Sequence, residues 1–337
     1  MKTILITGGA GFIGSHFVRH ILNTYDDYHV INLDKLTYAG NLDNLLDVTE
    51  NSRYEFVKGD ICNAELVDHL MQRVDLVANF AAESHVDRSI MGAEEFIKSN
   101  ALGVYTLLAA ARDHNVERFL QVSTDEVYGS LDEEEDPWTE DSPIAPRNPY
   151  SVPKAAGDQM ARAFAITYDL PVVITRASNN IGSFQYPEKR VPIYITNAIN
   201  DFSLPVYGAG AAIRDHLYVT DHCDAIDLVL HKGTPGEAYN VGGENEADGL
   251  SVAEKILEHL EKPKDLMQHV ADRPGHDMRY SLNASKIMAL GWEPRYNFED
   301  ALRLTVEWYL GNEDWWRKIR DSASYREYYK LQYEDRK

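Results

Sequence analysis

The sequence is poor in cysteine and in long apolar runs, and both shortages narrow the classes of protein that it can encode. Two cysteines, Cys62 and Cys223, are too few for a disulfide framework or a cysteine-based metal site, so we predict no metal. No apolar run is long enough to cross a bilayer, and the chain enters a predicted strand at residues 2–6 without a cleavable leader. We therefore expect a cytoplasmic protein with no membrane partner.

Basic residues are also scarce, with 33 Lys and Arg against 54 Asp and Glu, which gives a net charge of -21. The summed negative field repels phosphate backbones and anionic bilayers, so we expect no nucleic-acid partner. A small anionic substrate would bind only where local cations override the global sign. The acidic run at 132–136 is typical of a solvated loop.

The spacing of apolar residues predicts the fold class. Apolar runs occupy 3–7, 29–33, 54–57, 76–80, 119–122 and 172–175, and segments of helical periodicity such as 12–22 and 101–113 separate them. This alternation is typical of an α/β, Rossmann-like, doubly wound parallel sheet. A further helix is expected over 219–230, with Thr220 and Asp221 as its cap.

The 337 residues, of which 44% are hydrophobic, are enough for two domains at roughly 100–200 residues per domain. Beyond Arg176, prolines and glycines interrupt short mixed elements. We predict a Rossmann domain over 1–177, with 216–241 packing back onto it, and a smaller mixed α/β domain over 178–337.

A glycine-rich turn, Thr7-Gly-Gly-Ala-Gly-Phe-Ile-Gly14, follows the first predicted strand. Such glycines let main-chain N–H groups approach a pyrophosphate at a helix N-terminus. Asp34 ends the second strand 20 residues after Gly14, where a carboxylate can accept both hydroxyls of an adenosine ribose. Asp34 would repel a 2′-phosphate, so the pattern favours NAD over NADP, although Lys35 weakens that preference. Asp60 is either an adenine neighbour or a loop cap.

A Tyr150-x-x-x-Lys154 pair places two side chains on one helix face. A cationic Lys154 can lower the pKa of Tyr150 and orient the nicotinamide ribose, so that Tyr150 becomes a usable base for an alcohol proton. Pro153 is compatible with this helix only if the helix begins at Pro149 or Tyr150.

Two adjacent carboxylates, Asp125 and Glu126, follow Thr124 at the end of a predicted strand. Neighbouring carboxyl groups push their pKa values apart, so one can stay protonated near neutral pH. A pocket that holds this pair beside Tyr150 could oxidise an alcohol and also eliminate water, which exceeds the needs of a plain dehydrogenase.

At this point the chain resembles the extended short-chain dehydrogenase/reductases and, within them, the dTDP-glucose 4,6-dehydratases. The motifs that carry the resemblance lie at residues 7–14, 33–41, 79–89, 123–129, 178–180, 187–189, 204–208, 213–215 and 272–277. The similar nucleotide-sugar epimerases and UDP-glucuronate decarboxylases do not usually carry the Asp125–Glu126 pair.

The resemblance implies conversion of dTDP-glucose to dTDP-4-keto-6-deoxyglucose and water, by oxidation at C4, elimination across C5 and C6, and hydride return to C6. It assigns Tyr150 as base for the C4 hydroxyl, Glu126 for the C5 proton and Asp125 as acid for the C6 oxygen, with Thr124 bonding the sugar. It also implies a tightly bound NAD that is recycled in each turnover, and a homodimer formed through a four-helix interface. The segments 101–113 and 154–168 are candidates for this interface, although their Ala- and Leu-rich surfaces could equally face the sheet.

The cofactor contacts expected from the turn and the resemblance together are Gly8, Gly11, Phe12, Ile13, Gly14, Asp34, Lys35, Thr37, Gly40, Asp60, Ile61, Ala81, Ala82, Ser84, Val122, Tyr150, Lys154 and Asn179. The nucleotide-sugar contacts that the resemblance implies are Ser84, His85, Thr124, Asn179, Glu188, Lys189, Arg190, Pro205, Tyr207, Arg214, Asn245, Arg273, His276 and Tyr333. Lys189, Arg214 and Arg273 supply the local cations that a diphosphate requires.

Four positions depart from the family pattern and leave alternatives open. Ala177 stands in place of Cys, Ile181 in place of Tyr, Arg190 in place of an aliphatic residue and His216 in place of Trp. Thymidine is the first expectation for the base and uridine the second. The remaining alternatives are an epimerase or decarboxylase and a non-catalytic NAD-binding redox sensor.

Overall fold

A computed structural model describes residues 1–272 and 275–334. Across these residues, no helix combines the length and the apolar character that crossing a bilayer requires.

A parallel sheet organises the first half of the chain, as the apolar spacing predicts. Within the described residues its seven strands lie in the order β10-β6-β5-β4-β1-β2-β3. Their bounds are β1 (Lys2–Thr7), β2 (Tyr28–Asp34), β3 (Tyr54–Lys58), β4 (Leu76–Asn79), β5 (Arg118–Thr124), β6 (Val172–Ala177) and β10 (Ala238–Val241). Because β1 pairs with both β2 and β4, the strand order reverses at β1, the point where doubly wound sheets bind ligands.

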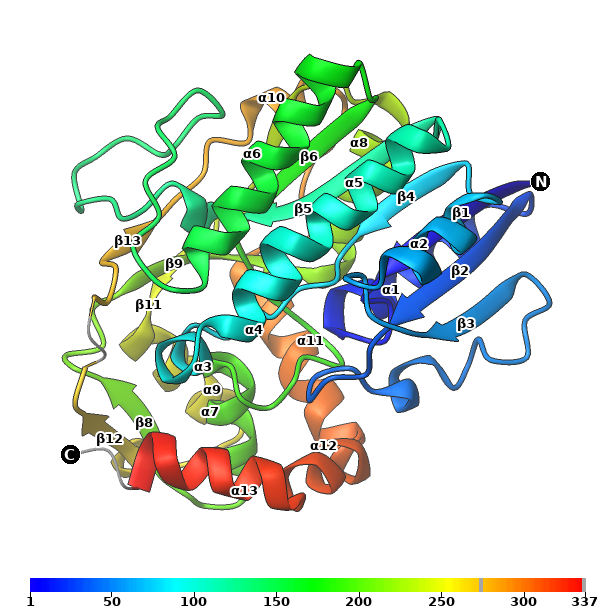
Figure 1. Cartoon of the computed structure of the whole chain (residues 1–337). Coiled ribbons are helices and arrows are strands. Elements are labelled where there is room, and N and C mark those ends of the chain that lie inside the picture. The colour runs from blue at the N-terminus through cyan, green and yellow to red at the C-terminus, as the bar shows by residue number, and fades with distance from the viewer. Residues whose placement is uncertain (273–274, 335–337) are drawn as a thin grey trace.

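Helices cover both faces of this sheet, and each face has its own apolar core. Ile4 and Ile6 of β1 pack with helices α1 (Phe12–Thr24) and α8 (Val219–Lys232). Leu5, between them, points to the opposite core with α2 (Ala64–Met71), α5 (Val104–Asp113) and α6 (Ser151–Tyr168). The alternation follows from the two-residue repeat of a strand. Figure 1 shows α5 and α6 side by side across the sheet.

The second half adds a smaller mixed region beside the carboxyl ends of the large sheet. Its strands are β7 (Asn179–Ile181), β8 (Leu204–Tyr207), β9 (Ile213–Tyr218), β11 (Glu246–Asp248), β12 (Met267–Val270) and β13 (Arg279–Tyr280). Its helices α7 (Arg190–Ile199), α9 (Gly249–His259) and α11 (Phe298–Gly311) enclose a third apolar core, and α12 (Glu313–Arg320) and α13 (Ala323–Tyr329) follow (Figure 1).

The shorter elements connect these layers. They are η1 (Leu42–Leu45), α3 (Val86–Met91), α4 (Glu94–Ile97), η2 (Lys98–Gly103), η3 (Asp125–Val127), η4 (Lys264–Leu266), α10 (Ser285–Met288) and η5 (Lys330–Glu334).

The segment expected to be helical over 101–113 is helical throughout: it begins in the π-helical turn η2 and continues as α5. One local expectation is wrong. Helix α8 begins at Val219 after Tyr218, with no side-chain cap. Asp221 lies inside the first turn of α8 and does not cap it. Its carboxylate instead accepts the main-chain N–H groups of Arg295 and Tyr296 at 2.9 and 3.0 Å.

Candidate active site

The glycine-rich turn connects β1 to α1 and leaves main-chain atoms uncovered. Gly8 has φ +70°, which disfavours other residues, and a Cβ on Gly14 would lie 2.2 Å from the Gly8 carbonyl oxygen. Gly11 precedes α1, and no side chain caps this helix. The first main-chain N–H groups of α1 can therefore face a phosphate. The turn therefore fits the pyrophosphate of a dinucleotide.

Asp34 stands at the carboxyl end of β2 beside this turn. Its two carboxylate oxygens accept the N–H groups of Ala10 and Leu36 at 2.9 and 2.8 Å. Burial raises the pKa of Asp34, and these two bonds oppose the rise. The Lys35 ammonium forms an ion pair with the Asp60 carboxylate at 2.9 Å, so a carboxylate already neutralises the cation next to Asp34. Asp60 also accepts the N–H of Cys62 at 2.9 Å and thus acts as a loop cap at the cavity wall.

A cavity of about 370 Å³ extends from this turn. The structure brings all the expected cofactor contacts except Asn179 to its wall, namely Gly8, Gly11, Phe12, Ile13, Gly14, Asp34, Lys35, Thr37, Gly40, Asp60, Ile61, Ala81, Ala82, Ser84, Val122, Tyr150 and Lys154. The turn, the carboxylate and the cavity together fit NAD.

A second cavity of about 290 Å³ adjoins the first and shares Val122, Ser84 and Tyr150 with it. Thr124, Asp125 and Glu126 line this second cavity on the turn η3 that follows β5. Tyr150 thus stands at the boundary between the cofactor side and the acid-lined side. A sugar bound at this boundary could contact both the cofactor and the two carboxyl groups.

The helix start makes room for Pro153. Helix α6 begins at Ser151, so Pro153 lies in the first turn, where its missing N–H costs no helical bond. Asn148 caps this end by accepting the N–H groups of Tyr150 and Ser151 at 3.1 and 2.8 Å. The same Asn148 donates its side-chain N–H to Glu126 at 3.1 Å, which joins the helix start to η3.

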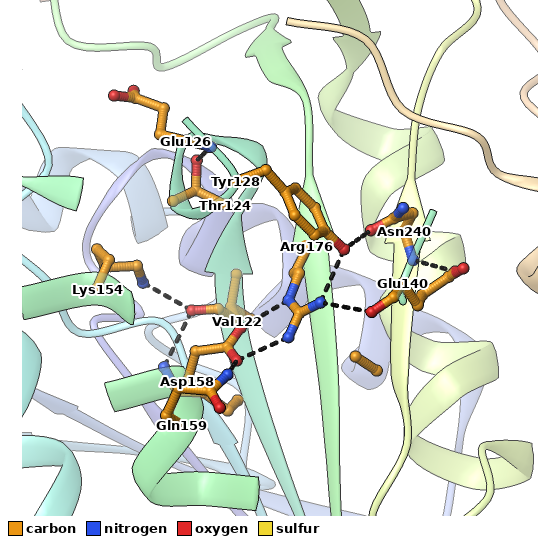
Figure 2. A network of polar contacts seen from close by, with 12 residues as sticks. Val122, Thr124, Glu126, Tyr128, Glu140, Lys154, Asp158, Gln159, Arg176 and Asn240 are labelled. Atoms are coloured by element: carbon orange, nitrogen blue, oxygen red, sulfur yellow. Dashed lines mark hydrogen bonds and ion pairs between the residues drawn. The ribbon is translucent and has the colours of Figure 1, made fainter. Parts of the chain in front are cut away.

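The expected lowering of the Tyr150 pKa by Lys154 does not occur in this structure. The Lys154 ammonium donates to the Val122 carbonyl at 2.7 Å, as Figure 2 shows. Burial raises the pKa of Tyr150, and the charges of Glu126 and Asp125 raise it further. Burial also lowers the pKa of Lys154 to about 8, against the opposing charge of Asp158.

Asp125 has the environment of a carboxylic acid that keeps its proton. Burial, followed by the charge of Glu126, raises the pKa of Asp125 to about 8. Thr124 donates to its Oδ1 at 3.0 Å, while within the described residues Oδ2 is buried without a hydrogen-bond partner. An unpartnered buried oxygen at a cavity wall is a natural contact for substrate.

The expected substrate contacts are mostly gathered at this cavity. Ser84, His85, Thr124, Asn179, Glu188, Lys189, Arg190, Pro205, Tyr207, Arg214, His276 and Tyr333 line it. Asn179 is on the substrate side and not on the cofactor side, where it was also expected. Arg273 lies outside the described residues. The four departures from the family pattern, Ala177, Ile181, Arg190 and His216, also line this cavity.

Asn245 is not brought to the cavity wall. Its amide N–H groups donate to the carbonyls of His216 and Tyr296, both at 3.2 Å, and its oxygen accepts the N–H of Phe298 at 3.0 Å. It therefore supports the main chain behind His216. Arg214 does line the cavity, and its guanidinium also donates to the carbonyls of Ile213 and Asp277 at 2.7 and 2.9 Å.

Sequence reasoning missed two residues at this site. Tyr280 of β13 lies 3.5 Å from Glu126 Oε2 and 2.5 Å from Asp277, with the Arg214 guanidinium 4.0 Å from its ring centre. No local pattern connects Tyr280 to Glu126, 154 residues earlier. Asn148 could have been found, since an Asn shortly before a helix is a common cap.

The fold and the two joined cavities define a class, the NAD-dependent enzymes of the extended short-chain dehydrogenase/reductase type. The family model described as GDP-mannose 4,6 dehydratase matches residues 5–305. The chain is 51% identical over 311 residues to the low-salt glycan biosynthesis protein Agl12 of Haloferax volcanii, covering 92% of this chain and 99% of that one.

It is 49% identical over 322 residues to a dTDP-glucose 4,6-dehydratase of Streptomyces niveus, covering 94% and 95% of the two chains. The dTDP-glucose 4,6-dehydratase DesIV of Streptomyces venezuelae, solved with NAD bound, superposes with a TM-score of 0.92 at 47% identity over 94% of this chain and 99% of that one. The chain therefore belongs to the NAD-dependent nucleotide-sugar 4,6-dehydratase family.

Proposed function

We propose that this protein is a hydro-lyase that converts dTDP-glucose to dTDP-4-keto-6-deoxyglucose and water. The observation that carries this proposal is a carboxylic acid with a pKa raised to about 8, Asp125, next to Glu126 in a cavity that shares Tyr150 with the NAD cavity. Hydride transfer alone needs neither group, since Tyr150 serves the alcohol proton. A dehydratase needs both.

Each proton has a defined place. The positive charge of a bound, oxidised nicotinamide would oppose the rise in the Tyr150 pKa that burial causes, so that the Tyr150 phenolate can take the proton of the C4 hydroxyl. The buried Thr124 holds the sugar at this end. Glu126 takes the C5 proton, which a ketone at C4 makes acidic, and Asp125 gives its proton to the departing C6 oxygen. Asn148 and Tyr280 hold the Glu126 carboxylate in position, through contacts of 3.1 and 3.5 Å.

Bound NAD supplies the hydride acceptor and donor that C4 and C6 require. The Gly8–Gly14 turn and Asp34 would hold the cofactor, and Lys154, which also lines this cavity, would orient its nicotinamide ribose. The segment 185–189 borders both cavities, because Gln185, Glu188 and Lys189 line each of them. Arg88 forms an ion pair with Glu188 at 2.7 Å, which fixes this shared wall.

The four departures from the family pattern bear on which nucleotide base the substrate carries. Thymidine is the first candidate, supported by the dTDP-glucose dehydratases to which the chain is similar. Uridine is the second, since Arg190 and His216 place polar groups at the cavity wall, 3.2 Å from each other. Residues 178–337 contribute this nucleotide side of the site.

Product analysis tests the proposal. The purified protein is incubated with dTDP-glucose and, in parallel, with UDP-glucose, and each product is analysed by mass spectrometry and NMR. We expect dTDP-glucose to lose one water and gain a 4-ketone. Inversion at C4 without loss of mass would indicate an epimerase, and an unchanged sugar with bound NAD would indicate a redox sensor. Faster turnover of UDP-glucose would assign the uridine nucleotide.

We further propose that two copies of the chain associate through α5 and α6. Tyr105 of α5 and Tyr168 of α6 are 48% exposed each, and both contact the Phe164 ring between them. Half-exposed aromatic side chains are enriched at protein interfaces, so these two rings are candidates for contact with a second copy. Tyr105→Asp should yield a monomer by light scattering, whereas Phe202→Asp, on an exposed residue elsewhere, should leave the dimer intact. A wild-type monomer contradicts this part of the proposal.

We place the reaction in the cytoplasm. Cys62 and Cys223, the two cysteines of the chain, are both free thiols, as a reducing compartment allows. Fractionation of the source cells with an antibody against the chain tests this location.

A further inference from the structure

A buried ion pair lies directly behind the candidate catalytic residues. Arg176 of β6 makes two parallel hydrogen bonds to Asp158 of α6, with Nε to Oδ2 and Nη2 to Oδ1 both at 2.9 Å. Arg176 is 2% exposed and Asp158 is 0% exposed. Neither residue lines the cofactor or the substrate cavity.

The same guanidinium continues to the turn that carries the acids. Nη1 of Arg176 donates to the hydroxyl oxygen of Tyr128 at 2.7 Å, and the Tyr128 hydroxyl donates to Asn240 Oδ1 at 2.8 Å. Asn240 is anchored in turn by Glu140, which accepts its main-chain N–H at 2.8 Å. Figure 2 shows this chain of contacts running from α6 to β10 beneath η3.

The network connects the two halves of the candidate catalytic set. Asp158 lies one helical turn after Lys154 on α6, the helix that Tyr150 precedes. Tyr128 follows directly after η3, which carries Asp125 and Glu126. Arg176 therefore bonds to both elements at once, and a shift of either element would break one of its hydrogen bonds.

Stability alone does not account for such a pair. Removing two charges from water is costly, and apolar residues of similar shape are often as stable or more stable at such a position. A planar guanidinium with two bonds to Asp158, one to Tyr128 and a longer one to the Glu140 carbonyl sets geometry better than apolar packing does. The pair is therefore suited to fixing distance and orientation.

We propose that Arg176 and Asp158, with Tyr128, are positioning residues that hold the Tyr150–Lys154 helix at a fixed distance from the Asp125–Glu126 turn. This inference rests on the proposed dehydration, because only that reaction uses both groups on one sugar. The alignment affects the chemical step and not substrate binding. Loss of the network should therefore lower kcat and leave KM and the NAD content unchanged.

Tyr128→Phe is the first test, since it removes one hydroxyl and keeps the ring packed on Trp138. We expect kcat for dTDP-glucose to fall about tenfold or more, because misplacement by a fraction of an ångström is enough to slow a preorganised reaction. Tyr239→Phe is the matched control: this neighbouring buried tyrosine also loses one hydrogen bond, to the Thr234 N–H, but lies outside the network. Equal kcat values for the two variants would overturn the inference.

The double variant Asp158→Leu/Arg176→Met is the second test. It should keep its melting temperature, because it buries no unpaired charge, and still lose about a hundredfold in kcat with KM within about twofold of wild type. A folded double variant with wild-type kcat would show that the pair is only structural. If it does not fold, Tyr128→Phe decides. A wild-type protein that leaves dTDP-glucose unchanged overturns the proposed function together with this inference, whereas normal turnover in the variants overturns the inference alone.

Discussion

Asp125 is the residue at which function and stability oppose each other. Its folded pKa is raised to about 8, mainly by burial, whereas an unfolded Asp has a pKa near 4. Between these values the folded state binds a proton that the unfolded state has released. The free energy of unfolding therefore falls as the pH rises from about 4 to about 8.

Asp125→Asn should consequently stabilise the protein, with a larger gain in melting temperature at pH 8 than at pH 5. The amide keeps the bond from Thr124 and has no charge to bury. Thermal unfolding at the two pH values measures the difference. Asp132→Asn, on an exposed loop, is the control and should show no such pH dependence. A variant that is less stable than wild type at pH 8 would contradict the assignment of a protonated Asp125.

The same substitution should slow water loss by about 10²–10⁴-fold, the usual contribution of a positioned acid. In the wild-type protein the rate of water loss should also decline above about pH 8, because Asp125 then loses the proton that it must donate. Single-turnover mass spectrometry across pH 6–9 follows this step. A rate that still rises at pH 9 would exclude Asp125 as the acid.

Glu126→Gln separates the two carboxyl groups. This variant should still oxidise C4, seen as absorbance of reduced nicotinamide, but it should suppress entry of solvent deuterium at C5. Glu134→Gln, on the exposed acidic loop, serves as the control with normal exchange. Normal deuterium entry in Glu126→Gln would assign the C5 proton to another group.

How far the site could be predicted depends on how local each contact is. Asp125, Glu126 and Tyr150 were found because short spacings and neighbouring elements define them. Asn245 was placed less well, because carbonyl groups from distant segments accept its side-chain N–H groups. Tyr280 could not be found at all, since its place beside Glu126 depends on the pairing of β13 with β9.

At the scale of elements, the glycine turn between β1 and α1 has no room for a single added methyl group at Gly14. A Cβ on Gly14 would lie 2.2 Å from the Gly8 oxygen and 2.8 Å from Gly9 Cα, both main-chain atoms that cannot yield cheaply. Gly14→Ala should therefore deform the pyrophosphate turn before it affects the sheet.

We expect Gly14→Ala to be purified with little or no NAD, while the wild-type protein retains it. Chromatography of the nucleotide released on denaturation gives the occupancy. Gly92→Ala is the matched control, because a Cβ there meets nothing within 4 Å. Full NAD occupancy in Gly14→Ala would mean that the turn does not hold the pyrophosphate.

Element types were more predictable than element ends. The six predicted apolar runs are all strands of the large sheet in the structure. Parallel strands are buried on both faces and therefore consist of nearly continuous apolar residues, which makes them easy to recognise in a sequence. The start of α6 was predicted to within a residue or two: a start at Pro149 or Tyr150 was expected from Pro153, and the helix begins at Ser151, which also leaves Pro153 in the first turn. The π-helical turn η2 had no counterpart in the pattern, since packing of this turn on α6 decides its geometry. The boundary at 177/178 stays a prediction.

At the scale of the whole molecule, the acidic surface and the site make opposite demands. The net charge of -21 repels a nucleotide diphosphate, yet Lys189, Arg190 and Arg214 gather at the substrate cavity. The same excess of negative charge opposes the compact state through self-repulsion. Screening by salt should relieve this repulsion.

The melting temperature should therefore rise with sodium chloride, with much of the gain reached by about 0.15 M, where the Debye length is about 8 Å. The triple variant Asp132→Asn/Glu133→Gln/Glu134→Gln reduces the net charge from -21 to -18 on one exposed loop. It should melt at a higher temperature than wild type in low salt and gain less from added salt, because less repulsion remains to be screened. Scanning calorimetry over a salt series compares the two proteins. Parallel salt dependences would show that specific ion pairs, and not the summed charge, govern the response.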